Sequence, residues 1–103
     1  MLKVMSLMKR GEGMSYEEFK KWALEEHPVL AKAIPGMRHY RMNVTLTDNP
    51  DLPYDVVSEM WFDDEEARAA GFATEAGKAA GADAAGHASN RVHLMVEEKI
   101  IIE

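Results

Sequence analysis

Residues 37–62, MRHYRMNVTLTDNPDLPYDVVSEMWF, contain two strand-like segments separated by a polar loop. Residues 37–47 alternate apolar and polar side chains over a length typical of a strand, and residues 54–62 place Val56, Met60 and Phe62 on one face with Ser58. Pro50 and Pro53 interrupt regular structure between them, but the loop is too short to separate two domains. The stretch therefore predicts two consecutive strands in the middle of the chain.

A helix is expected on the N-terminal side of these strands. Ser15 followed by Glu18 forms a capping box, in which each side chain satisfies an unpaired backbone N–H. Pro28 lacks an N–H and disfavours helical geometry at the preceding residue, so His27 is expected at a kink or a helix end. Apolar residues recur behind the cap at helical spacing: Phe19, Trp22, Ala23, Leu30 and Ile34.

A second helix is expected on the C-terminal side, opened by the acidic pair Asp63 and Glu66. Residues 67–88 are dominated by Ala and Gly, and each Gly weakens a helix by roughly 1 kcal/mol relative to Ala. We therefore expect this helix to fray or break beyond Gly77, and His87 to lie in a loop. The small residues either let the helix approach a sheet closely or leave room for a ligand.

The two ends of the chain complete the fold. Residues 2–8 carry apolar side chains on both faces, as a central strand does, and residues 91–102 form the last strand. The order is strand, helix, strand, strand, helix, strand. Right-handed crossovers then place both helices on one face of a four-stranded antiparallel sheet, the α+β arrangement called ferredoxin-like. Residues 1–103 are expected to form one domain.

The sheet face turned away from the helices is expected to be mixed. An apolar area as large as a tryptophan side chain seldom stays exposed to water. Residues 100–102, all Ile, would also leave an exposed hydrophobic edge. Two copies packed sheet to sheet would cover both features, so a homodimer is predicted. The side chains assigned to this face are Met5, Leu7, His39, Arg41, Val57, Glu59, Trp61, His93 and Met95.

Composition excludes several classes of function. Acidic residues outnumber basic ones 18 to 12, for a net charge of −6, which disfavours nucleic acid and anionic membrane surfaces. The chain has no Cys, and its histidines lack metal-ligand spacing, so neither a metal nor another cofactor is expected. Its apolar runs are far shorter than the ~20 residues of a membrane span, and its start does not match a signal peptide. A cytoplasmic location is expected.

At this point the chain resembles the EthD family, named for ethyl tert-butyl ether degradation, within the dimeric α+β barrel group. The resemblance covers most of the chain and implies a dimeric barrel of small-molecule catabolism. It rests on the order of five segments: Met14-Ser15-x-x-Glu18-Phe19, His27-Pro28, Ile34-Pro35-Gly36-Met37-Arg38-His39-Tyr40, Glu59-Met60-Trp61-Phe62-Asp63 and Val96-Glu97-Glu98.

The family is similar to methylmuconolactone methylisomerase and to fungal dehydratases of aromatic polyketides. The resemblance therefore implies cofactor-free acid/base chemistry, an isomerase or lyase acting on a small hydrophobic carbonyl or aromatic compound. The isomerase lines its pocket with a helix histidine and a strand tyrosine, which correspond here to His27 and Tyr40. In the founding operon the EthD protein accompanies a cytochrome P450 system, which implies an accessory role as the alternative.

Three polar residues are the candidates for a site. His27 can exchange protons near neutral pH, or it can merely hydrogen-bond carbonyls freed by Pro28. Tyr40, on the helix-facing side of its strand, can donate to a developing enolate or phenolate oxygen, or it can be a core tyrosine. Arg38 on the same side can clamp a carboxylate, or it can lie in solvent.

The remaining candidates are apolar and are core residues unless a cavity exists, in which case they form its wall and bind substrate. They are Trp22, Met42, Met60, Phe62 and Phe72.

Three functions stay open at this point. The first is a homodimeric isomerase or lyase with His27 as acid/base and Tyr40 as oxygen donor. The second is a non-catalytic protein that delivers a hydrophobic metabolite to an oxygenase. The third is a haem-binding or cofactorless monooxygenase, for which Trp61 and His93 are the only indications.

Overall fold

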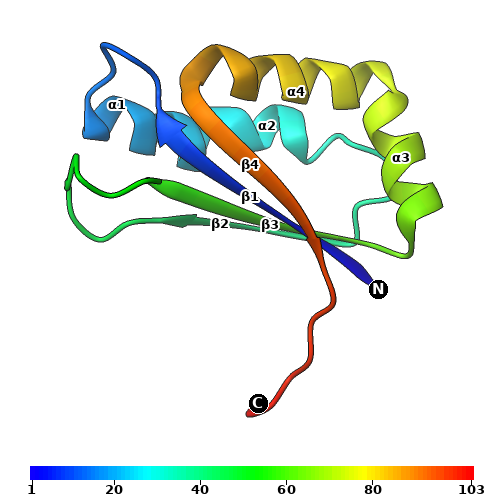
Figure 1. Cartoon of the computed structure of the whole chain (residues 1–103). Helices are drawn as coiled ribbons and strands as arrows, with labels where there is room; N and C mark the ends of the chain where they lie inside the picture. Colours follow the sequence, from blue (N-terminus) through cyan, green and yellow to red (C-terminus); the bar gives the residue numbers. More distant parts are fainter.

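The computed structural model describes residues 1–103 as a four-stranded antiparallel sheet with helices over one face (Figure 1). The order across the sheet is β2-β3-β1-β4. This confirms the ferredoxin-like α+β arrangement, and β1 is central, as its two apolar faces predict. The strands are β1 Leu2–Arg10, β2 His39–Val44, β3 Val56–Phe62 and β4 Ala88–Val96.

The first helical segment runs over residues 16–31 as α1 (Tyr16–Lys21), a π turn η1 (Trp22–Glu26) and α2 (His27–Ala31). The capping box forms at its start, where Ser15 Oγ accepts from the Glu18 N–H at 3.0 Å and Glu18 Oε1 accepts from the Ser15 N–H at 3.0 Å. None of the helices in the fold has the length and hydrophobicity that a bilayer crossing requires.

Pro28 lies inside this helical segment rather than ending it. In an α-helix its ring would collide with the carbonyl four residues earlier, and its missing N–H would leave that carbonyl unpaired. The π turn resolves the conflict by adding a residue, so that the His27 N–H reaches the Trp22 carbonyl, five residues back. His27 is thus the first residue after the π turn, and this turn is the kink that the sequence predicts.

The second helical segment breaks earlier than expected. It consists of α3 (Glu65–Ala73) and α4 (Glu75–His87), with Asp64 rather than Asp63 as the first cap. Thr74 separates the two helices; its hydroxyl donates to the Gly71 carbonyl at 2.6 Å and accepts from the Gly77 N–H at 3.1 Å. The predicted break beyond Gly77 is therefore wrong.

The glycines at this corner serve close packing. A Cβ on Gly77 would lie 2.5 Å from the Gly71 carbonyl oxygen, so glycine is needed where α3 and α4 meet. Helix α4 continues through Gly81 to His87, whose Nδ1 donates to the Asp83 carbonyl at 2.7 Å. The prediction that His87 lies in a loop is also wrong.

The side of β4 that faces the helices is the opposite of the one predicted from the sequence. Directly opposed residues of an antiparallel pair share a face, and His93 pairs with Ser6 while Met95 pairs with Val4. His93 and Met95 therefore point toward the helices, not away from them. The apolar residues of β4 that the sequence pattern assigned to the helices lie on the open face instead: Val92, Leu94 and Val96.

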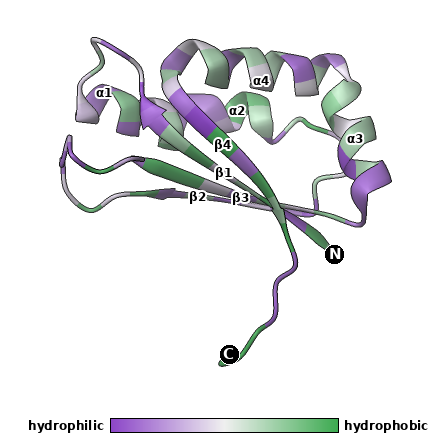
Figure 2. Ribbon diagram, viewed as in Figure 1, coloured by the Kyte–Doolittle hydropathy of each residue, from purple (hydrophilic) through white to green (hydrophobic).

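The C-terminal residues leave the sheet after Val96 and extend away from it (Figure 1). The predicted last strand is therefore too long, because residues 97–102 have no neighbouring strand to pair with. Ile100, Ile101 and Ile102 are 63%, 78% and 91% exposed. Figure 2 shows this hydrophobic end of the tail.

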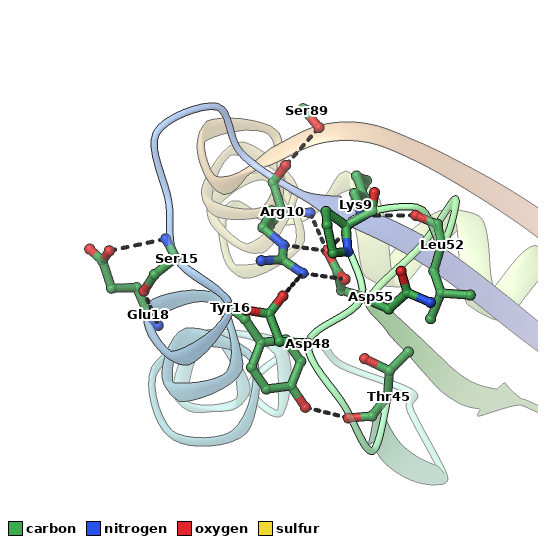
Figure 3. A network of polar contacts seen from close by, with 12 residues as sticks. Lys9, Arg10, Ser15, Tyr16, Glu18, Thr45, Asp48, Leu52, Asp55 and Ser89 are labelled. Carbon is green, nitrogen blue, oxygen red and sulfur yellow. Dashed lines mark hydrogen bonds and ion pairs between the residues drawn. The ribbon is translucent and has the colours of Figure 1, made fainter.

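A buried ion pair joins the end of β1 to the start of β3 (Figure 3). Asp55 is 1% exposed, and both of its carboxylate oxygens accept from the Arg10 guanidinium at 3.0 Å. Its Oδ2 also accepts from the Arg10 backbone N–H at 3.0 Å. Burial alone would raise the pKa of Asp55, but these hydrogen bonds outweigh it and hold the pKa below its ordinary value.

Replacing Asp55 with Ala should destabilise the fold by about 3 kcal/mol, since it leaves the partly buried guanidinium of Arg10 with only the more exposed carboxylate of Asp48 as a partner. Because the folded pKa is depressed, this contribution is present above the unfolded pKa and is lost as pH falls through the folded pKa. Urea unfolding at pH 7 and at pH 3 measures both effects. Asp63→Ala, which removes the partner of the exposed Arg38, is the control and should change the midpoint far less. Equal midpoints for the two variants at pH 7 would contradict the assignment.

Candidate functional site

A cavity of about 370 Å³ lies between the sheet and the helices over it. This volume is near the lower end of the roughly 300–1,000 Å³ usual for small-molecule sites. Ten of its 18 lining residues are hydrophobic, so most of the wall is apolar. The cavity therefore has the size and surface to hold a compact organic molecule.

Small residues of α4 form one wall of the cavity. Gly77, Ala80, Gly81 and Ala84 all line it. A Cβ added at Gly81 would meet no atom within 4 Å, so there is free space where a larger side chain would stand. The small residues of α4 thus leave room beside the sheet, which settles the alternative that the sequence left open.

His27 lines this cavity and is anchored from behind by Asp83 of α4. Its Nδ1 lies 2.8 Å from Asp83 Oδ2, and the imidazole is buried, with 7% of the residue exposed. An ionised carboxylate only accepts hydrogen bonds, so Nδ1 carries the proton and Nε2 of the neutral ring is left as an acceptor. No group of the chain hydrogen-bonds Nε2. An imidazole held in this way is able to accept a proton at Nε2.

The π turn explains why His27 and Trp22 reach the same carboxylate. Residues five apart in an α-helix point about 140° from each other, because each residue turns by about 100°. In η1 the longer turn brings His27 over Trp22, and their ring centroids are 4.7 Å apart. Trp22 Nε1 donates to Asp83 Oδ2 at 3.0 Å beside the histidine.

Trp22 also packs against His87. The ring of His87 stacks on the indole, with centroids 4.7 Å apart and planes inclined by 15°. Together these contacts bury Trp22, which is 2% exposed and does not line the cavity. The indole therefore supports the imidazole instead of contacting a ligand.

Tyr40 lines the cavity from β2, and its hydroxyl is buried without a hydrogen-bond partner. Desolvation raises the pKa of Tyr40 to about 12, so the phenol is protonated at neutral pH. Buried polar groups are nearly always paired, and an unpaired donor in a cavity is available to a ligand oxygen.

A second set of polar side chains lines the cavity from the central strands β1 and β3 and from the edge strand β4. Ser6 Oγ of β1 lies 2.6 Å from His93 Nδ1 of β4, and both line the cavity with Ser58 of β3. Partial desolvation, and then the nearby Arg91 and Arg68, lower the pKa of His93. Both arginines also line the cavity.

Comparison with known proteins assigns the family. The EthD domain matches residues 11–90, most of the chain. The chain belongs to the EthD family. No curated protein matches it.

Solved structures agree with this assignment. An EthD family protein from Bacillus halodurans C-125 is 26% identical, with a TM-score of 0.82 over 96% of this chain and 99% of that one. Two further structures show the same fold. A dimeric ferredoxin-like protein of unknown function from Thermobifida fusca YX is 19% identical, with a TM-score of 0.74 over 92% and 88% of the two chains. An antibiotic biosynthesis monooxygenase is 18% identical, with a TM-score of 0.69 over 96% and 99%.

The EthD chain brings together only some of the residues that its sequence predicts for the site. His27, Tyr40, Met60 and Phe72 line one cavity. The remaining predicted substrate contacts lie outside it: Trp22, Arg38, Met42 and Phe62.

These four residues have other partners. Phe62 is fully buried in the core around Val4, and Met42 packs against the core around Phe19. Arg38 is exposed and forms an ion pair with Asp63 at 2.8 Å, because it precedes β2 at the rim of the sheet.

Sequence reasoning missed most of the polar lining. Ser6 and Ser58 carried a visible signal, since each interrupts the apolar, helix-facing side of its strand. Arg91 and His93 were missed because the sequence pattern assigned the two faces of β4 the wrong way round. Asp83 was missed because 56 residues separate it from His27. Trp61 and His93, the indications of a haem or monooxygenase site, lie on opposite faces of the sheet and form no common site. No group of three or more His, Cys, Asp or Glu side chains could hold a metal ion.

Replacing Tyr40 with Phe should leave the stability of the EthD fold unchanged or raise it by up to about 1 kcal/mol, because it removes a buried donor that has no partner. Urea unfolding of the two proteins measures this. Tyr16→Phe is the matched control, since the Tyr16 hydroxyl donates to the Thr45 carbonyl and its loss should destabilise. A clear loss of stability in the Tyr40 variant would show that the hydroxyl has a partner after all.

Proposed function

We propose that this EthD protein binds a small, mostly hydrophobic carbonyl or aromatic compound in its cavity and catalyses a cofactor-free isomerisation or elimination. The observation that carries the proposal is that His27, oriented by Asp83, and the unpartnered phenol of Tyr40 line the same cavity. Family membership supports a role in small-molecule metabolism.

The chemistry follows from the two polar groups. Nε2 of neutral His27 takes a proton from a carbon next to the carbonyl, and the electron pair of that C–H bond moves to the carbonyl oxygen. The Asp83 carboxylate, 2.8 Å from Nδ1, stabilises the imidazolium that forms. The Tyr40 hydroxyl donates a hydrogen bond to the enolate oxygen.

The enolate then has two outcomes. In an isomerase, the imidazolium returns its proton to another carbon. In a lyase, the electron pair expels a leaving group on the next carbon, and the imidazolium protonates that group. Neither outcome needs an oxidant or a metal. The apolar wall strengthens the hydrogen bonds on which both outcomes depend, because it lowers the local dielectric constant.

Proton exchange tests the catalytic role directly. Ketones and aromatic lactones of suitable size, incubated with the protein in D₂O, should exchange the hydrogen next to the carbonyl, as measured by proton NMR. His27→Gln should slow the exchange by at least about 100-fold, the usual contribution of general acid–base catalysis. His39→Gln, on the opposite face of the sheet, is the matched control and should keep the wild-type rate. Undiminished exchange by a folded His27 variant would remove His27 from the mechanism.

The alternative is a non-catalytic carrier that delivers a hydrophobic metabolite to an oxygenase. The predominantly apolar wall favours it, since such a wall alone can bind a hydrophobic molecule. A carrier would bind members of the same panel without exchange. Its affinity would be almost indifferent to His27→Gln and Tyr40→Phe.

We also propose that two copies pack through their open sheet faces to form a homodimer. Leu94 is 46% exposed there and lies opposite Met5 of the central strand, so the apolar area continues across the sheet. The exposed Ile100 and Ile102 border the same face beside Trp61. The similar Thermobifida fusca protein is described as dimeric, which supports the proposal.

Replacing Leu94 with Arg should convert the dimer to a folded monomer, because it places a charge in the middle of the proposed interface. Sedimentation velocity over a range of concentrations measures the change. Leu46→Arg is the matched control, since Leu46 is 98% exposed in the loop after β2. A Leu94 variant that sediments like the wild type would show that the chain does not associate through this face.

A further inference from the structure

We infer that the ligand of the cavity carries a carboxylate and that Arg91, assisted by Arg68, binds this carboxylate at the β4 side of the cavity. The inference rests on the proposed function, because it names the class of molecule that the same cavity accepts. It follows from the charges around the cavity, the partners of the two arginines and the place of each polar group in the sheet.

The lining of the cavity has the opposite charge from the protein as a whole. The chain carries 18 acidic and 12 basic residues, yet none of the 18 lining residues is Asp or Glu. Arg68 and Arg91 line the cavity, with His27 and His93. The space between sheet and helices is therefore electropositive in an acidic protein, and it favours an anion over a neutral or cationic molecule.

Of the two arginines that line the cavity, Arg91 is the one without a counter-ion. Arg68 forms an ion pair with Glu65 at 2.6 Å, whereas the only hydrogen bond of the Arg91 guanidinium goes to the Gly81 carbonyl at 3.3 Å. A partly buried guanidinium without a carboxylate is costly, and its planar donors match a carboxylate better than any other anion-binding side chain does. Most of these donors remain available to a ligand.

Ser6 and His93 extend the same side of the cavity. Arg91 and His93 are two residues apart in β4 and face the helices, opposite Met8 and Ser6 of β1. After desolvation, the charges of Arg91 and Arg68 also lower the pKa of His93, in keeping with their place beside this ring at the cavity. A carboxylate placed among them would be attracted by the two guanidinium groups and would cancel part of their positive field.

The sheet order separates this side from the phenol. Strands β2 and β4 are the two edges, with β3 and β1 between them, so Tyr40 and Arg91 come from opposite edges of the sheet. Edge strands in such a sheet are about 14 Å apart at the backbone, and their side chains reach inward. A ligand bound by both residues presents its carboxylate to β4 and its carbonyl or phenolic oxygen to β2.

Matched carboxylates and amides test the inference. Benzoate, phenylacetate and cinnamate are each titrated beside the corresponding primary amide at pH 7.5 and low salt, with binding followed by NMR of the wild-type protein. Each carboxylate that binds should do so at least about tenfold more tightly than its amide, as expected for charge-assisted hydrogen bonds. Carboxylate binding should also raise the pKa of His93, because a nearby anion favours the imidazolium.

Variants locate the anion. Arg91→Gln should remove the preference for carboxylates without weakening the amides, and Arg91→Lys should restore only part of it, since it returns the charge but not the planar fork. Lys78→Gln removes the same charge from the exposed side of α4 and should change nothing. Thermal unfolding of each variant verifies that it is folded.

The possible failures are distinguishable. Equal affinities for carboxylate and amide, or a preference that survives in folded Arg91→Gln and Arg68→Gln, would overturn the inference and leave the proposed function standing. A lack of cavity binding by every member of both series would count against the proposed function and the inference together.

Discussion

The carboxylate of Asp83 is the group on which the site depends, because it ties α4 to the helical segment of residues 16–31. It accepts from the indole of Trp22 at 3.0 Å and from the imidazole of His27 at 2.8 Å. Helix α4 is built mainly of small residues, which offer little side-chain surface for packing on the sheet. The hydrogen bonds to Asp83 therefore hold the helix in place, as large apolar side chains do in an ordinary contact between a helix and a sheet. Because the side chains of α4 are small, space remains between the helix and the sheet. The same contact selects the tautomer of His27.

The π turn is the backbone feature that makes this attachment possible. A π turn is rare in proteins and is found frequently at functional sites. Here it follows from Pro28, whose ring does not fit a regular helix, and it brings residues five apart to one side. The His27-Pro28 pair thus has a mechanical role. The proline creates the turn, and the turn aligns the histidine with Trp22 and Asp83.

Much of the fold could be predicted from local patterns. The capping box of Ser15, the apolar faces of β1 and the shared apolar face of Val56, Met60 and Phe62 follow from neighbours in the sequence, and they predict the order of elements correctly. Strand β4 was assigned the wrong way round because its helix-facing side borders a cavity, where Arg91 and His93 replace the apolar residues of a solid core. Its apolar side belongs to the open face. Hydrophobic periodicity cannot distinguish these cases, since it records only which side is apolar.

The site was predictable only in part for the same reason. His27 and Tyr40 could be selected by type and position, but Asp83 enters through a tertiary contact that no spacing reveals. The most direct test of the account is the affinity of Gly81→Leu for the tightest-binding compound of the carboxylate and amide series. Gly81 lines the cavity and has open space beside it, so a leucine there should stabilise α4 and fill the cavity. The account predicts an intact fold and affinity reduced at least about tenfold, through lost space for the ligand. Wild-type affinity in this variant would show that ligands bind elsewhere.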